Sequence, residues 1–174
     1  MIHPLLNFHP FAQRRLLWGT AALSLVFMVV LFVQGGPLRT PVAPGGVLSL
    51  QFAFRMNRAQ DVLDSWNDVN ETAQNQILID FGFLIVYPVA ISLACLAIFQ
   101  THAGAVRHAA LVLAWIALAA GPFDLLEDLA SLQMLSQGAT SLSAAVVSGA
   151  AVIKFLAALP PLLFLIVVAL VDRK

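Results

Sequence analysis

Four long apolar stretches alternate with polar segments along the chain, and this pattern predicts four membrane-spanning helices. Each stretch approaches or exceeds the ~20 residues that a helix needs to cross the hydrocarbon core of a bilayer. The predicted spans are residues 16–34, 76–100, 105–134 and 141–171. Residues 35–75 form the one long connection, and the other two connections are short turns. We therefore expect an all-α integral membrane protein in which residues 1–174 form a single four-helix bundle.

The first apolar stretch has two interpretations. Arg14 and Arg15 precede it, as basic residues precede the apolar segment of a secretory signal peptide. However, the stretch is long for such a segment, and Gln34-Gly35-Gly36-Pro37 does not resemble a cleavage site. We favour a retained first span.

The long connection is expected to be structured. Glycine and proline interrupt residues 35–46, which excludes a continuous helix there. From Val47 to Phe54, large apolar residues alternate with polar ones, and this period of two predicts a short extended segment.

A short amphipathic helix is predicted next, with Asn57 as its N-cap. Its apolar positions recur at helical spacing, and its opposite face is acidic. The apolar positions are Ala59, Val62, Leu63 and Trp66, and the acidic ones are Asp61, Asp64 and Asp68. The simpler interpretation is a helix at the membrane interface anchored by Trp66, and the alternative is a lid over a binding site.

Prolines and small residues modify the later spans. Asn70 or Thr72 is expected to start the second long helix, and Pro88 to kink it. Pro160-Pro161 is expected to divide the fourth span into two halves. The first of these halves contains small residues that suit close helix packing in lipid, namely Ser143, Ala144, Ser148, Gly149 and Ala151.

Composition supports the membrane assignment. The 174 residues are 60% hydrophobic and 10% charged, with a mean hydropathy of +0.90, whereas soluble domains carry about 25% charged residues. Nine basic and nine acidic side chains cancel, so no net field favours nucleic acid as a partner. The single cysteine, Cys95, excludes an internal disulfide and two-cysteine redox chemistry.

Ionisable residues inside the apolar stretches are the candidate functional residues, because charge is costly in a bilayer. The segment Gly121 to Asp128 places Asp124, Glu127 and Asp128 within about one helical turn. Asp80 lies in the second span and shares a helix face with Tyr87, while Lys154 lies in the fourth. The candidate site is therefore Asp80, Tyr87, Asp124, Glu127, Asp128 and Lys154, with Trp66 above it.

Three interpretations of these residues are open. Lys154 can pair with Asp124 or Asp80 and hold three helices in register, with Glu127 and Asp128 already in water. The same residues can instead form a polar pocket that opens outward, or one of them can contact a partner subunit.

The chemistry of such a pocket is a cation or amine site, or a proton relay. Three or four carboxylates suit a hard cation, but the sequence assigns no metal ligands and indicates no cofactor. The four histidines, His3, His9, His102 and His108, are expected on the opposite side of the membrane, with His3 and His9 at the interface. No nucleophile motif or phosphate-binding loop is found. Several aromatic residues either line a lipid slot or simply pack, namely Phe81, Phe83, Tyr87, Trp115 and Phe123.

The distribution of basic residues predicts the orientation. Five basic residues fall on one side of a four-span topology: Arg14, Arg15, Arg107, Arg173 and Lys174. The positive-inside rule then places both termini in the cytoplasm and residues 35–75 outside. The compact loops suit a bacterial inner membrane.

We expect a non-enzymatic membrane protein that binds a small molecule or lipid, or serves as an accessory subunit of a membrane complex. The alternative is an intramembrane enzyme or proton-coupled carrier that uses the carboxylates and Lys154. The expected partners are the lipid bilayer and one such ligand or membrane subunit, and not nucleic acid.

Overall fold

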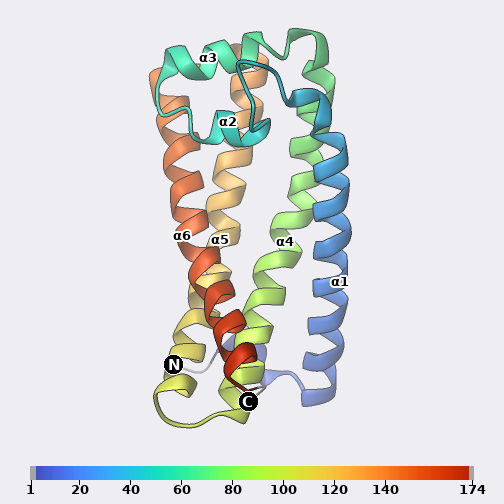
Figure 1. Ribbon diagram of the computed structural model, residues 1–174, viewed down its shortest axis with the longest axis vertical. Helices are drawn as coiled ribbons and strands as arrows, with labels where there is room; N and C mark the ends of the chain where they lie inside the picture. The colour runs from blue at the N-terminus through green and yellow to red at the C-terminus, as the bar shows by residue number, and fades with distance from the viewer. Residues whose placement is uncertain (1–2, 173–174) are drawn as a thin grey trace.

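The computed structural model describes residues 3–172, and this part of the chain contains helices and no strands (Figure 1). Four helices are long and apolar enough to cross a membrane: α1 (Pro10–Gln34), α4 (Asn70–Thr101), α5 (Gly104–Gln137) and α6 (Ser141–Val171). Each predicted span lies within one of them. Two short α-helices, α2 (Val47–Gln51) and α3 (Met56–Asp64), lie between α1 and α4. Short 3₁₀ helices occur at Pro4–Asn7, Gly36–Leu38 and Asn67–Val69.

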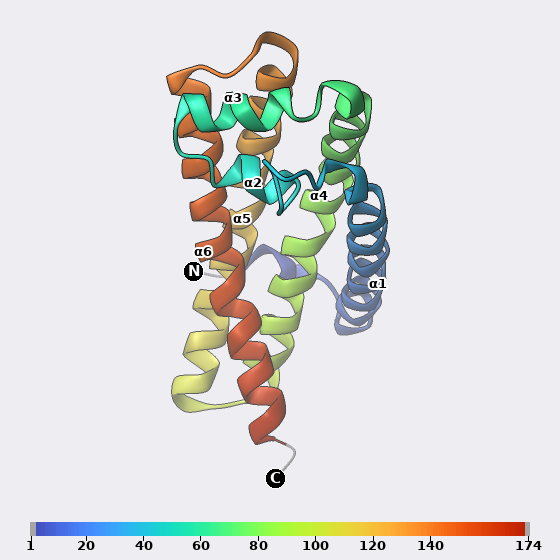
Figure 2. The same cartoon turned by 45° about the horizontal axis from the view of Figure 1, so that its top comes forward.

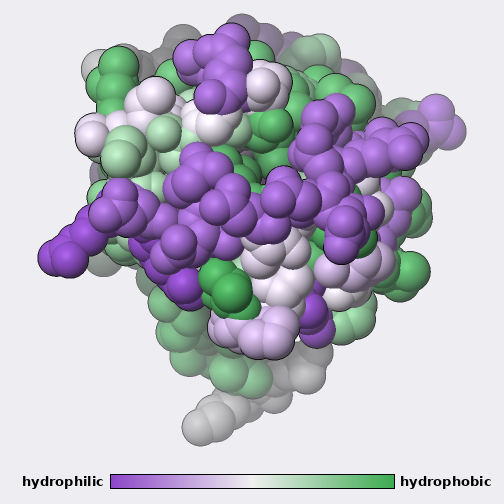
Figure 3. Space-filling view, turned by 90° about the horizontal axis from the view of Figure 1, so that it is seen from above, coloured by the Kyte–Doolittle hydropathy of each residue, from purple (hydrophilic) through white to green (hydrophobic). Residues whose placement is uncertain are grey.

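The long helices form an elongated bundle. α5 packs against both α4 and α6, whereas α1 packs mainly against α4 and stands at the edge (Figure 1). The start of α1, the α4–α5 turn and the end of α6 lie at one end of the bundle. Residues 35–69, which we call the cap, cover the other end (Figure 2). Seen from above, hydrophilic residues form a band across this end (Figure 3).

The predicted extended segment at Val47–Phe54 is wrong, because Val47–Gln51 is a helix. Gly46, at a φ of 59°, turns the chain into this helix, and the amide of Phe52 donates to the carbonyl of Leu48 at 3.1 Å. A segment of five residues fits both the period of a strand and that of a helix. Packing selects the helix, because it buries the adjacent residues Leu50 and Gln51 together.

The amphipathic helix is present, but two details differ from the prediction. Its apolar positions are buried and its acidic positions are exposed, as expected. However, α3 begins at Met56 after Arg55, so Asn57 is not the N-cap. Trp66 is 1% exposed and donates from Nε1 to the carbonyl of Leu38 at 2.8 Å. It is therefore a core residue of the cap and not an anchor at the membrane interface.

The fourth span is also more regular than expected. α6 is one continuous helix through Pro160-Pro161, since a helix within a bundle tolerates the carbonyls that proline leaves free. α4 starts at Asn70, as predicted, and contains Pro88. Four of the five small residues on α6 are buried against neighbours, and Gly149 is exposed.

The N-terminal segment packs on the bundle more closely than expected. His3 is fully buried, with Nε2 3.3 Å from Ser92 Oγ and its ring centroid 4.5 Å from that of Trp115. Burial lowers the pKa of His3, so its neutral form is favoured. The predicted place of His3 at the interface is therefore wrong, while His9 is exposed. The predicted basic residues Arg173 and Lys174 lie outside the described residues.

Candidate functional site

A buried ion pair joins α5 to α6 at the level of the predicted site. Lys154 Nζ lies 2.5 Å from Asp124 Oδ1 and 2.7 Å from Glu127 Oε2. Lys154 is 7% exposed, Asp124 2% and Glu127 1%. Asp124 and Glu127 are three residues apart, so one ammonium reaches both carboxylates from the facing helix. The pairing expected from the scarcity of charge is present.

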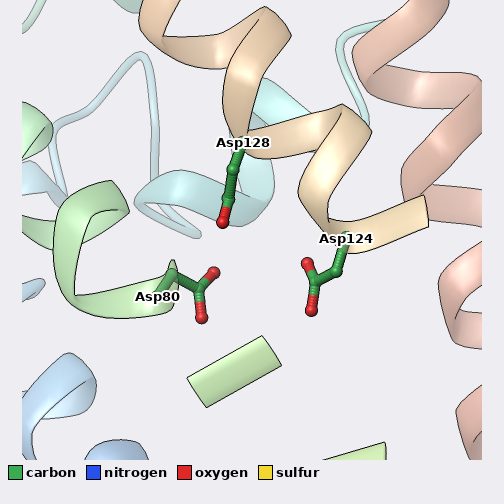
Figure 4. Close-up of side chains that lie close together, drawn as sticks. All are labelled: Asp80, Asp124 and Asp128. Carbon is green, nitrogen blue, oxygen red and sulfur yellow. The ribbon is translucent and has the colours of Figure 1, made fainter. Parts of the chain in front are cut away.

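Two further aspartates lie beside this pair. One oxygen from each of Asp80, Asp124 and Asp128 falls within 4.8 Å of the others, and the three side chains face a common space (Figure 4). We call Asp80, Asp124, Glu127, Asp128 and Lys154 the polar cluster. It brings together α4, α5 and α6, as the sequence predicted.

Glu127 and Asp128 are not in water, contrary to the expectation from the sequence. Asp128 is 2% exposed, and Gln51 Nε2 of α2 donates to Glu127 Oε1 at 2.5 Å. The reason for Glu127 is the cap: α2 lies between α6 on one side and α1 and α4 on the other (Figure 2), and its buried Gln51 contacts Glu127. This position of α2 could not be read from the spans alone.

A cavity of about 310 Å³ adjoins the cluster. Asp80, Asp124 and Lys154 line it, together with Tyr87 and the amides of Gln51 and Gln76. The other lining residues are apolar and come from α1, α2, α4 and α6: Leu31, Val47, Leu48, Ile77, Phe83, Ile91, Phe155, Ala158, Leu159 and Leu162.

The cavity opens at the side of the bundle. Leu48, Leu159 and Leu162 line it and are 50%, 50% and 39% exposed. These side chains belong to the apolar outer surface, whereas Gln51 is buried at the cap side of the cavity. The cavity is therefore open between one side chain of the cap, Leu48, and two of α6, Leu159 and Leu162.

Not every predicted residue reaches the cavity. Tyr87 lines it with Phe83, and their ring centroids are 4.7 Å apart. Three residues of the predicted site are not among the lining residues: Trp66, Glu127 and Asp128. Of the predicted aromatic residues, Phe81, Trp115 and Phe123 do not line it either. Gln51 and Gln76 were missed, although each is a polar residue at the edge of an apolar segment, which is the signal that would have found them.

Several buried acceptor oxygens have no hydrogen-bond partner among residues 3–172. They include Asp128 Oδ2, the side-chain carbonyls of Gln51 and Gln76, and the hydroxyl of Ser131. Because Gln51 donates its amide to Glu127, its carbonyl orientation is determined by that bond. Within the polar cluster, Asp128 Oδ2 is thus an acceptor without a donor in the described chain, and a cation or a hydrogen-bond donor beside it would satisfy it.

Histidine does not contribute to this site. The group of carboxylates contains no histidine, and His102 instead pairs with Asp172 through Nε2 and Oδ2, 3.1 Å apart. A mixed histidine and carboxylate metal centre is therefore not formed by the described residues.

No family model matches this chain, and no curated protein or solved structure is significantly similar to it. What the site does must be argued from its own geometry.

Proposed function

We propose that this chain is a multi-pass protein of a bacterial inner membrane that binds an amphiphilic small molecule or lipid. The cavity beside the polar cluster carries the proposal. Its outer wall is apolar and continuous with the surface of the bundle, and its inner wall is polar. An apolar chain with one polar end matches both walls.

The polar end of the ligand is expected to donate hydrogen bonds. Asp80 and Asp124 line the cavity, and their carboxylate oxygens accept hydrogen bonds. A hydroxyl, amide or ammonium group of the ligand can donate to them. The volume is near the lower limit of the about 300–1,000 Å³ typical of ligand sites, which favours a single-chain ligand.

The proposed orientation has both termini in the cytoplasm and the cap outside. Arg14, Arg15 and Arg107 belong to the end of the bundle opposite the cap. In the cap and the first turn of α4, three arginines are offset by four acidic residues. The positive-inside rule places the end richer in basic residues in the cytoplasm. The cavity, which α2 borders, would then receive its ligand from the outer leaflet.

A photoreactive long-chain alcohol tests the binding proposal. The protein in lipid nanodiscs is irradiated with a diazirine-bearing alcohol, and the labelled residues are found by mass spectrometry. We expect labels on cavity residues such as Ile91 and Leu159. Ala158→Trp, which fills the cavity, should abolish them.

Gly149→Trp is the matched control, since Gly149 is exposed and a Cβ added there meets no atom within 4 Å. Labelling spread evenly over the outer surface, or equal loss in both variants, would refute the proposal. Orientation is tested separately in a Cys95→Ser background: Asp64→Cys should react with a membrane-impermeant thiol reagent on intact cells, and Thr101→Cys only after lysis.

A further inference from the structure

Three aspartates from two helices converge on one space within the polar cluster. Asp80 comes from α4, and Asp124 and Asp128 come from one turn of α5 (Figure 4). One oxygen of each lies within 4.8 Å of the other two. Carboxylates repel one another at such distances unless a proton or a cation lies between them.

The ion pair with Lys154 does not neutralise this group. Lys154 is engaged with Asp124 Oδ1 and Glu127 Oε2, and no ion pair within residues 3–172 includes Asp80 or Asp128. Lys154 is also the one basic group among the charges that act on Asp128, the others being Asp80, Asp124 and Glu127. Four carboxylates and one ammonium give the cluster a formal charge of −3.

Asp128 points independently to a missing ligand. Its side chain is 2% exposed and directed at Asp80 and Asp124 (Figure 4), and Oδ2 receives no hydrogen bond from the described chain. Buried carboxylates are normally paired, hydrogen-bonded or bound to a metal. Asp128 has no pairing partner here, which leaves its free oxygen available as a ligand atom.

We propose that Asp80, Asp124 and Asp128 bind a hard divalent cation such as Ca²⁺. Ligand atoms that share one Ca²⁺, with bonds of about 2.3–2.6 Å, must lie within about 5 Å of one another. The three aspartate oxygens, which all fall within 4.8 Å of one another, meet this requirement.

The donor set also selects the class of metal. It consists of carboxylates alone, and the softer transition metals favour imidazole or thiolate ligands. Lys154 contacts one oxygen of Asp124, Oδ1, and a carboxylate has two oxygens, so the ion pair and coordination of a cation are compatible. A divalent ion would bring the formal charge of the cluster from −3 to −1.

The cation site adjoins the cavity. Asp80 and Asp124 line the cavity, whereas Asp128 does not. Water can fill the coordination positions that the three carboxylates leave. The inference does not depend on amphiphile binding, because three protein carboxylates and water suffice.

Calorimetry on the full-length protein in detergent, treated with a chelator and then titrated with CaCl₂, tests the cation site. We expect one Ca²⁺ per chain and a melting temperature that rises with Ca²⁺ concentration. Asp128→Asn should weaken Ca²⁺ binding at least 10-fold. The matched control is Asp64→Asn on the exposed face of α3, which should bind as the parent does.

Folding of the variant is checked without metal. Asp128→Asn removes an uncompensated buried charge, so its metal-free melting temperature should equal or exceed that of the parent. Absence of binding at millimolar Ca²⁺, or equal binding by the parent and Asp128→Asn, would overturn the proposal and indicate shared protons in the cluster. Asp128→Asn separates the two proposals, because Asp128 does not line the cavity: the variant should weaken Ca²⁺ binding and leave the alcohol label intact.

Discussion

Replacing Lys154 by methionine should expose how much the buried ion pair stabilises the bundle. Methionine retains the apolar stem but removes the ammonium, which leaves Asp124 and Glu127, 2% and 1% exposed, without their counter-charge. Breaking a buried pair from one side costs about 3–5 kcal/mol. At about 2–4 °C per kcal/mol for a chain of this size, the melting temperature should fall by about 6–20 °C.

The compensated variant is the decisive comparison. Lys154→Met combined with Asp124→Asn and Glu127→Gln removes all three charges and should recover most of the loss. Lys154→Met with Asp124→Asn alone should recover less, because Glu127 stays buried and charged. Arg55→Met, which removes an exposed basic residue, is the control and should change little.

Cys95 provides the assay. It is the single cysteine and is fully buried, so a thiol-reactive fluorogenic dye reports unfolding in detergent. Equal melting temperatures for the single and triple variants would refute the reasoning, since stranded carboxylates would then have no measurable cost.

Two further predictions concern packing and pH. A Cβ at Gly82 would lie 2.7 Å from Phe27 Cε1, so Gly82→Val should force α1 away from α4 and lower the melting temperature by several degrees. The control is Gly19→Val, because a Cβ at Gly19 meets no atom within 4 Å and the melting temperature should not change. Equal shifts in the two variants would contradict the packing of α1 against α4. His3 has a pKa below 6.5 in the folded protein, so the unfolded chain binds the extra proton as pH falls through 6.5 and stability decreases below that pH. The loss of folding stability between pH 7 and pH 5 should be smaller in His3→Gln than in the control His108→Gln, which changes an exposed histidine. Identical pH profiles of the two variants would contradict a buried, neutral His3.

The long helices could be predicted because hydrophobicity alone determines them. Each predicted span lies inside one helix, and the turn before Ser141 is where the pattern placed it. The pairing of Lys154 with Asp124 could also be predicted, because helix rise puts the two residues at similar depth and an unpaired charge is costly there.

The cap could not be predicted in the same way. Residues 47–51 fit a strand or a helix equally, and only their contact with α6 and the cluster decides between them. The burial of Trp66, Glu127 and Asp128 follows from how the cap folds over the bundle, which is tertiary packing and has no local signal. Orientation, ligand and the carrier or enzyme alternative stay predictions.

The two aspartates that Lys154 does not contact, Asp80 and Asp128, distinguish a binding site from a purely structural ion pair. Lys154 needs at most the two carboxylates that it contacts, so Asp80 and Asp128 add repulsion and desolvation cost without adding to the pairing of α5 with α6. If the cluster were only structural, replacing both surplus aspartates by asparagine would raise stability and change nothing else. If it binds a cation, the same double variant should melt higher than the metal-free parent but lose the stabilisation that Ca²⁺ gives to the parent. Stability and binding then change in opposite directions, as expected where residues are retained for function at the expense of stability.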